Sequence, residues 1–106
     1  MMKRLALVMA FSLTLTAHAE DVADVWKAKC KSCHGVDGKA KTKMGQKESI
    51  DDFSQPAWQK AESDAKIRQV ITEGSSRNSK MKAYKDKLTP EQIDALVGYI
   101  RTMKAK

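Results

Sequence analysis

The residues Cys30-Lys31-Ser32-Cys33-His34 place two thiols and one imidazole within five positions. On a helix, side chains three and four residues apart share a face, so all three groups can reach one flat ligand. The C-x-x-C-H spacing is the pattern of covalent haem attachment, in which the thiols add to two vinyl groups and the histidine ligates iron. The motif therefore predicts haem c held by Cys30, Cys33 and His34.

Three other sites could use the same residues. A structural zinc ion needs four ligands, and the motif supplies two thiols and one imidazole. A thioredoxin-like redox pair needs a strand-to-helix setting, which the surrounding sequence lacks. A disulfide between Cys30 and Cys33 would suit an oxidising compartment, but it leaves His34 and the long polar loops without a role. Haem is the favoured interpretation, and a disulfide-bonded binding module is the non-haem alternative.

Residues 1–19 have the layout of a secretory signal peptide. A basic start precedes an apolar run over residues 5–16, and Ala17-His18-Ala19 supplies a small-x-small cleavage site. The run of about 12 residues is well short of the ~20 that span a bilayer, so a membrane anchor is the weaker interpretation. We expect cleavage after Ala19, a cytochrome domain over residues 20–106 without a transmembrane segment, and a periplasmic location.

The mature domain is basic and has one histidine. Loss of Lys3 and Arg4 with the leader lowers the formal net charge from +7 to +5. Such a balance favours an acidic partner, whereas nucleic acid is a poor candidate because export removes the target and no binding motif is visible. Loss of His18 leaves His34 as the only imidazole. No second histidine then competes for an iron atom.

The mature sequence predicts an all-α fold of three to four helices joined by long polar loops. Apolar residues at helical spacing occupy 21–33, and Ser63 and Gly74 are placed to bound a second helix. Thr89-Pro90-Glu91-Gln92 predicts the start of the last helix, with a hydroxyl cap and a capping-box glutamine. Residues 35–57 and 75–83 are predicted loops. Loops of this length are unusual in a compact domain unless they have a function such as wrapping a cofactor.

A methionine is the natural donor for the second axial position of the iron, because no other histidine is present. The candidates are Met44, Met81 and Met103. Met103 continues the apolar stripe of the last helix, where core packing explains it. Met44 lies only ten residues from His34, whereas Met81 lies 47 residues beyond it in a lysine-rich loop without an apolar stripe. We therefore favour Met81 over Met44 as the second ligand.

The mature chain resembles small class I cytochromes c of the bacterial c5/c6-like kind. The matching stretches run from Trp26 to Gly35, from Lys80 to Tyr84 and from Leu88 to Arg101. The resemblance implies a small cytochrome c fold around one covalently bound haem c, with the first and last helices crossing beside it at Trp26 and Tyr99. It also implies His34 and Met81 as axial iron ligands and one-electron transfer through an exposed haem edge.

Three positions depart from the family pattern. Val22 stands where the family has a glycine at the helix crossing, and we expect Gly98 to supply the missing space from the last helix. Lys82 replaces the proline that often follows the ligand methionine, which predicts a less rigid loop and a weaker iron–methionine bond. The loop after the motif has Met44-Gly45-Gln46 where many relatives have Gly-Pro, so the acceptor for the second ring nitrogen of His34 is not identified.

Lysines gather around both ligand regions. In the fold that the resemblance implies, they border the exposed haem edge and predict a basic surface that steers an acidic redox partner, with rates that fall as salt rises. Seven flank the motif and four flank Met81: Lys27, Lys29, Lys31, Lys39, Lys41, Lys43 and Lys47, then Lys80, Lys82, Lys85 and Lys87.

The predicted function is a soluble, exported, monomeric one-electron carrier and not an enzyme, because no acid–base pair or activated nucleophile is visible. The alternative is a haem sensor or small catalytic subunit, in which Met81 leaves and the iron takes a small ligand such as carbon monoxide or peroxide. Lys82 is the sequence feature that supports this alternative. We also expect Phe53 or Trp58 to wrap the lower haem edge and Tyr84 to pack on its methionine side.

Overall fold

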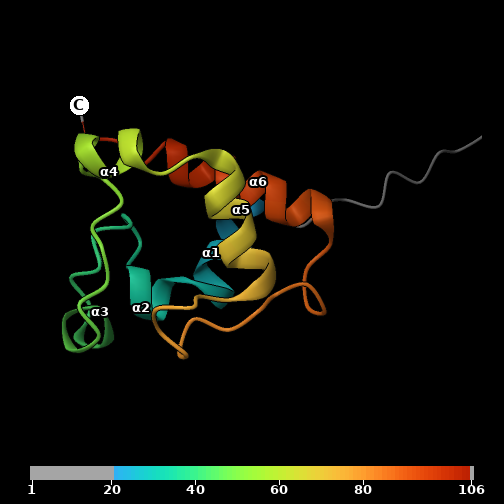
Figure 1. Ribbon diagram of the computed structural model, residues 1–106, viewed down its shortest axis with the longest axis horizontal. Coiled ribbons are helices and arrows are strands. Elements are labelled where there is room, and N and C mark those ends of the chain that lie inside the picture. The colour runs from blue at the N-terminus through green and yellow to red at the C-terminus, as the bar shows by residue number, and fades with distance from the viewer. Residues whose placement is uncertain (1–20, 106) are drawn as a thin grey trace, which may run out of the picture.

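Helices supply the regular secondary structure of residues 21–105, which are the residues that the computed structural model describes. Figure 1 shows α4 and α6 along the top of the view and α2 and α3 in the lower part, with α5 running downward from the top to the level of α1. The all-α prediction is confirmed for these residues, and the signal-peptide prediction for residues 1–19 lies outside them. The helices are α1 (Val22–Lys29), α2 (Lys31–His34), α3 (Lys43–Lys47), α4 (Pro56–Ala61), α5 (Asp64–Glu73) and α6 (Pro90–Arg101).

Side-chain caps determine where the two longest helices begin. The Ser63 hydroxyl accepts a hydrogen bond from the Lys66 backbone N–H at 3.1 Å and starts α5. At α6 the Thr89 hydroxyl accepts from the Gln92 backbone N–H at 3.2 Å, and the Gln92 side chain accepts from the Thr89 N–H at 2.9 Å. This reciprocal pair is the predicted capping box. The helix boundaries predicted at Ser63 and Thr89 are confirmed.

The predicted first helix and the predicted loop over 35–57 are more broken than the sequence pattern indicates. The helix over 21–33 is interrupted at Cys30, which ends α1 and precedes α2. The loop contains α3 and the start of α4. The Thr42 hydroxyl caps α3 by accepting from the Gly45 N–H at 2.8 Å, and Pro56 occupies the first turn of α4. Helices of five and six residues are too short to show an apolar period.

The hydrophobic core lies between α1, α5 and α6. Trp26 of α1 and Leu96 of α6 are its most completely buried large side chains. Trp26 meets Tyr99 of α6 with ring centroids 5.6 Å apart, so these aromatic residues lie at the α1–α6 contact as the resemblance implies. The buried cluster consists of Val25, Trp26, Ile67, Ile71, Leu88, Ile93, Leu96, Val97 and Ile100.

The expectation that Gly98 opens space at the helix crossing is wrong. Gly98 is exposed, and a Cβ atom placed on it would meet no atom within 4 Å. Its neighbours Leu96 and Val97 are buried on the core side of α6, which leaves Gly98 on the solvent side. Val22, at the position of the family glycine, is half-buried and packs against the core cluster.

Candidate haem site

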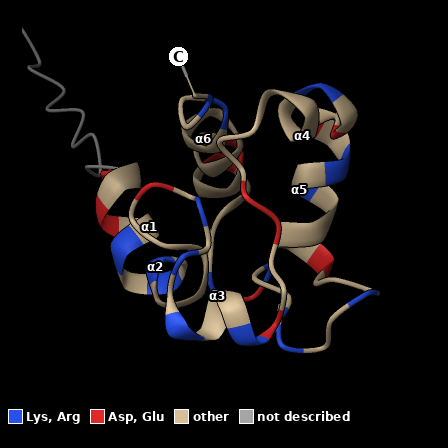
Figure 2. Ribbon diagram, turned by 90° about the vertical axis from the view of Figure 1, so that its left-hand side faces the viewer, with Lys and Arg blue, Asp and Glu red and all other residues tan. Residues whose placement is uncertain are grey.

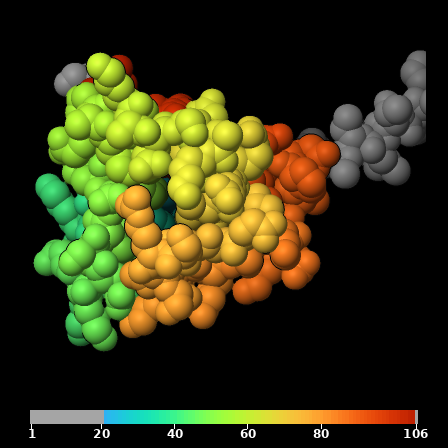
Figure 3. Space-filling model, in the orientation of Figure 1, coloured from blue at the N-terminus to red at the C-terminus, as the bar shows by residue number. Residues whose placement is uncertain are grey.

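A cavity of about 660 Å³ brings the predicted site residues together. Cys30, Cys33, His34 and Met81 all line it. Figure 3 shows its mouth as a hollow between the orange segment that follows α5 and the yellow-green surface of α4 and α5, with teal atoms at its floor. The volume lies within the ~300–1,000 Å³ that small-molecule and cofactor sites usually have.

The lining of the cavity is largely apolar, as a porphyrin ring requires. Its walls come from the core helices and from the loop between α3 and α4. Phe53 and Trp58 both line it and stack on each other with ring centroids 4.3 Å apart, and Tyr84 lines it from the other wall. The apolar lining includes Trp26, Ile50, Phe53, Trp58, Ile67, Val70, Ile71, Leu88, Leu96 and Ile100.

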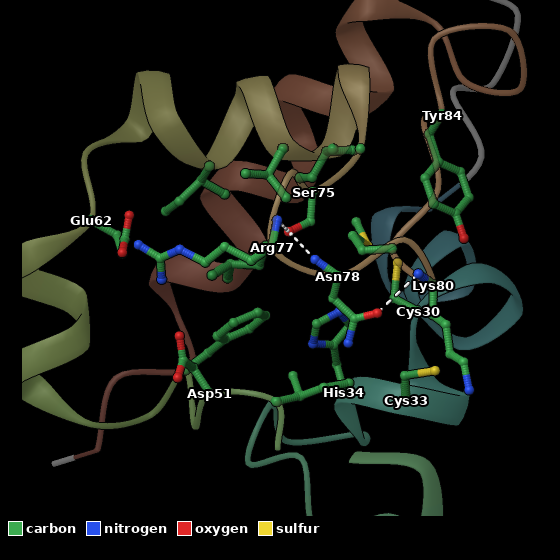
Figure 4. Close-up of a pocket in the computed structure, with 18 of the residues that line it drawn as sticks. Cys30, Cys33, His34, Asp51, Glu62, Ser75, Arg77, Asn78, Lys80 and Tyr84 are labelled. Atoms are coloured by element: carbon green, nitrogen blue, oxygen red, sulfur yellow. Dashed lines mark hydrogen bonds between the residues drawn. The ribbon is translucent and has the colours of Figure 1, made fainter. Parts of the chain in front are cut away.

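The two thiols stand at the junction of α1 and α2. Figure 4 shows Cys30, Cys33 and His34 on neighbouring turns of this segment, beside the same space. Both cysteines are half-buried free thiols. Burial, reinforced by the neighbouring Cys33, raises the pKa of Cys30 to about 11. Cys30 is therefore a protonated thiol at neutral pH, and an S–H group is what adds across a vinyl double bond.

His34 has the protonation state that an iron ligand needs. Burial lowers the pKa of its imidazole to about 4, so the ring is neutral at physiological pH. Its Nδ1 atom is buried and has no hydrogen-bond partner among residues 21–105. The ring stacks on Phe53 with centroids 4.7 Å apart. A neutral imidazole stacked on Phe53 at the wall of an apolar cavity fits an axial ligand of haem. Its buried Nδ1 is the ring nitrogen for which the sequence identified no acceptor, and residues 21–105 supply none.

Hydrogen bonds hold the backbone that follows the motif. The Trp26 indole N–H donates to the Gly35 carbonyl at 2.8 Å, and both groups are buried. The Ala40 backbone N–H donates to the His34 carbonyl at 2.9 Å. Trp26 therefore packs in the core and, through this hydrogen bond to Gly35, also fixes the turn that follows His34.

The segment around Gly45 supports the motif by close packing. The Thr42 hydroxyl donates to the Cys33 carbonyl at 2.6 Å and accepts from the Gly45 N–H. A Cβ atom on Gly45 would collide with the carbonyl oxygens of Cys33 and Ala40. This segment occupies the place of the family Gly-Pro, and here hydrogen bonds and a close glycine contact hold the motif.

Met81 reaches the cavity from a loop that closes on itself. The Met81 N–H donates to the Asn78 carbonyl, and the Ser75 N–H donates to the Met81 carbonyl, both at 3.1 Å. Gly74 ends α5 with φ +86°, and a Cβ atom there would lie 3.0 Å from the Met81 carbonyl oxygen. Glycine is needed at this position both for its backbone angle and for the approach of the loop.

The other two methionines are placed less favourably for ligation. Met44 also lines the cavity, but it is among the most exposed large apolar side chains, at 36%. Met103 packs against the core and over Gly38, where its sulfur occupies the space that a Cβ atom would take. The prediction that Met103 serves core packing is confirmed.

Several polar residues at the cavity have no signal in the sequence. Figure 4 shows the Arg77 side chain extending between Glu62 and Asp51. Glu48 and Asn78 also line the cavity and contact each other from segments 30 residues apart. Isolated polar residues in loops have no periodicity or motif, so only the tertiary structure identifies them.

The predicted lysine surface is largely exposed. Ten of the eleven lysines around the ligand regions are exposed, and Lys39 is half-buried. Figure 2 shows basic residues along α1, α2 and α3. Lys80 and Lys85 pair with Glu48 and Glu73. In the part of the chain that the structure describes, no helix has the length and apolar character to cross a membrane.

Comparison with known proteins assigns the family. The family model described as cytochrome c oxidase, cbb3-type, subunit III matches residues 17–100. The chain belongs to this family. The cbb3-type subunit FixP of Azorhizobium caulinodans is 34% identical to this cytochrome over 88 residues, which cover 83% of this chain and 28% of the relative. The cytochrome thus spans less than a third of that relative's length.

Solved c-type cytochromes have the same fold as this family member. The structure described as KustC0563 c-type cytochrome has a TM-score of 0.73 and 37% identity, covering 81% of this cytochrome and 100% of that chain. A tyrosine-to-phenylalanine mutant of Kustc0563 has a TM-score of 0.70 and 38% identity, covering 80% and 100%. The predicted cytochrome c fold with one covalently bound haem c is confirmed.

Proposed function

We propose that this cytochrome is an exported one-electron carrier whose haem is attached through Cys30 and Cys33 and whose iron is ligated by His34 and Met81. The observation that carries the proposal is the convergence of all four side chains on one cavity. Met81 lies 47 residues beyond His34 in the chain. A folding pattern that returns a thioether to the wall of the same cavity supports its role as the second ligand.

When bound, haem supplies an iron atom that alternates between two oxidation states one electron apart. His34 contributes a neutral donor, and the Met81 thioether favours the reduced state, which raises the reduction potential. The apolar lining excludes water and so also raises the potential. Three cations among residues 21–105 line the same cavity. Lys80 is paired with Glu48, so Arg77 and Lys66 are the ones that would balance the two propionate charges of a haem.

The lysine surface supports transient docking of an acidic redox partner to a monomeric, periplasmic carrier. Charge attraction of this kind speeds encounter more than it strengthens the complex, which suits a carrier that must leave after each transfer. Because the relative FixP is named as an oxidase subunit, an oxidase of that type is a candidate acceptor. The hydrogen-bonded Met81 loop favours this carrier over the alternative sensor or small catalytic subunit, in which Met81 must leave.

The test begins with protein produced in a host that matures c-type cytochromes. An alkaline pyridine spectrum of the denatured protein should show covalently held haem, and Cys30→Ser with Cys33→Ser should abolish it. Oxidised wild type should show the sulfur-to-iron charge-transfer band, which Met81→Leu should remove and the matched Met44→Leu should keep. Absence of covalent haem would refute the function, and rapid carbon monoxide binding by reduced wild type would favour the sensor.

A further inference from the structure

The loop that carries Met81 is fastened across the mouth of the cavity to the end of α3. The Lys80 ammonium donates to Glu48 Oε1 at 2.7 Å, and the Asn78 side-chain amide donates to Glu48 Oε2 at 3.1 Å. One carboxylate therefore binds two residues of the loop, and each of its oxygens has its own donor. We refer to Glu48, Asn78 and Lys80 as the latch.

Asn78 connects the latch to the backbone that positions Met81. Its side-chain oxygen accepts from the Lys80 N–H at 3.0 Å, and its carbonyl accepts from the Met81 N–H at 3.1 Å. Its own N–H donates to the Ser75 hydroxyl at 3.3 Å, which Figure 4 draws as a dashed line. A displacement of Asn78 would be transmitted to Met81 within three residues.

The position and burial of Glu48 set the latch apart from an ordinary surface ion pair. The Glu48 side chain is only 18% exposed, whereas both members of the Lys85–Glu73 pair are more than 50% exposed. Glu48 is also the C-cap of α3, where the helix dipole disfavours a negative charge. The Glu48 charge is therefore unfavourable for the dipole of α3 but favourable for the hydrogen bonds from Asn78 and Lys80 of the loop.

We propose that the latch positions Met81 and holds it on the iron, in place of the proline that Lys82 replaces. This inference rests on the proposed ligation of the iron by Met81. An external ligand reaches the iron only when Met81 has left, so its apparent affinity scales with the fraction of molecules in which the loop is open. Loss of the latch raises that fraction and leaves the haem attachment and the helix core unchanged.

The test measures binding of imidazole to the oxidised, haem-loaded protein. Glu48→Ala should raise the apparent affinity about tenfold, because it removes both hydrogen bonds to the carboxylate, each weakened by partial exposure to solvent. Glu48→Gln should give a smaller rise, because its amide oxygen can still accept from Asn78. The charge-transfer band of Glu48→Ala should weaken as imidazole is added at lower concentrations than in wild type.

Asp94→Ala is the matched control, since it removes the Arg68–Asp94 pair between α5 and α6 outside the cavity. It should leave the imidazole affinity unchanged. If Glu48→Ala and Asp94→Ala bind imidazole with equal affinity, and Met81→Leu abolishes the charge-transfer band, the latch is overturned. The proposed function then remains intact. A band that survives in Met81→Leu would overturn both the ligand assignment and the latch. If Glu48→Ala does not fold, Lys80→Met and Asn78→Ala test the same two contacts.

Discussion

Gly45 offers a sharp test of how the haem motif is supported. A Cβ atom there would lie 2.7 Å from the Cys33 carbonyl oxygen and would collide with the Ala40 carbonyl. Both contacts are with backbone, which cannot rotate away as a flexible side chain would. Gly45→Ala should therefore force the backbone apart and destabilise the fold by about 1–3 kcal/mol, the usual cost of overpacking.

The assay is thermal unfolding of the haem-loaded protein, followed by circular dichroism. For a domain of this size, about 2 kcal/mol lowers the Tm by roughly 10 °C. Gly98→Ala is the matched control because the same methyl group would meet no atom within 4 Å. On an exposed helix position, alanine is favoured over glycine by about 0.5–1 kcal/mol, so this variant should melt at a higher temperature.

The two glycines should thus respond to one substitution with opposite signs. A Gly45→Ala variant as stable as wild type would refute the close approach of α3 to the motif. A Gly98→Ala variant that melts lower would refute the solvent-facing position of Gly98 on α6. A fall in both melting temperatures by the same amount would point to a general cost of alanine at glycine positions and would contradict the packing argument.

Two further predictions concern a buried hydrogen bond and an acidic group. Trp26→Phe should cost about 1–3 kcal/mol in urea unfolding, because the buried Gly35 carbonyl loses the indole donor at 2.8 Å and keeps only the longer bond of 3.4 Å from the Gly38 N–H; an unchanged midpoint would contradict this role. Hydrogen bonds from Lys80 and Asn78 lower the pKa of Glu48, so its carboxylate stabilises the fold above the unfolded pKa of ~4.3. The difference in free energy of unfolding between wild type and Glu48→Gln should be constant near neutral pH and vanish as the pH falls through the lowered pKa of Glu48 in the folded protein. A difference that does not change with pH would refute a role for the Glu48 charge.

Local chemistry made much of this site predictable from sequence. The C-x-x-C-H spacing, the caps at Ser63 and Thr89 and the glycine after α5 act within a few residues, so each can be recognised without the fold. The placement of Met81 at the cavity followed from elimination among three methionines, because few alternatives existed.

Contacts between distant segments account for what the sequence did not predict. Glu48 meets Lys80 across 32 residues, and nothing near either residue marks the pair. The error at Gly98 has the same origin, since a glycine on a helix has the same local signature whether it faces a neighbour or solvent. The support of the motif by Gly45 depends on the path of a short helix that has no apolar period.

The closure of the Ser75–Met81 segment by its own hydrogen bonds has an evolutionary consequence. A segment whose conformation depends mainly on internal contacts and on one external anchor can be exchanged as a unit. With Met81 as the proposed ligand, substitutions within the segment can tune the electron affinity of the iron while the helix core remains under separate selection. Related cytochromes could therefore evolve different midpoint potentials through substitutions in the Ser75–Met81 segment alone.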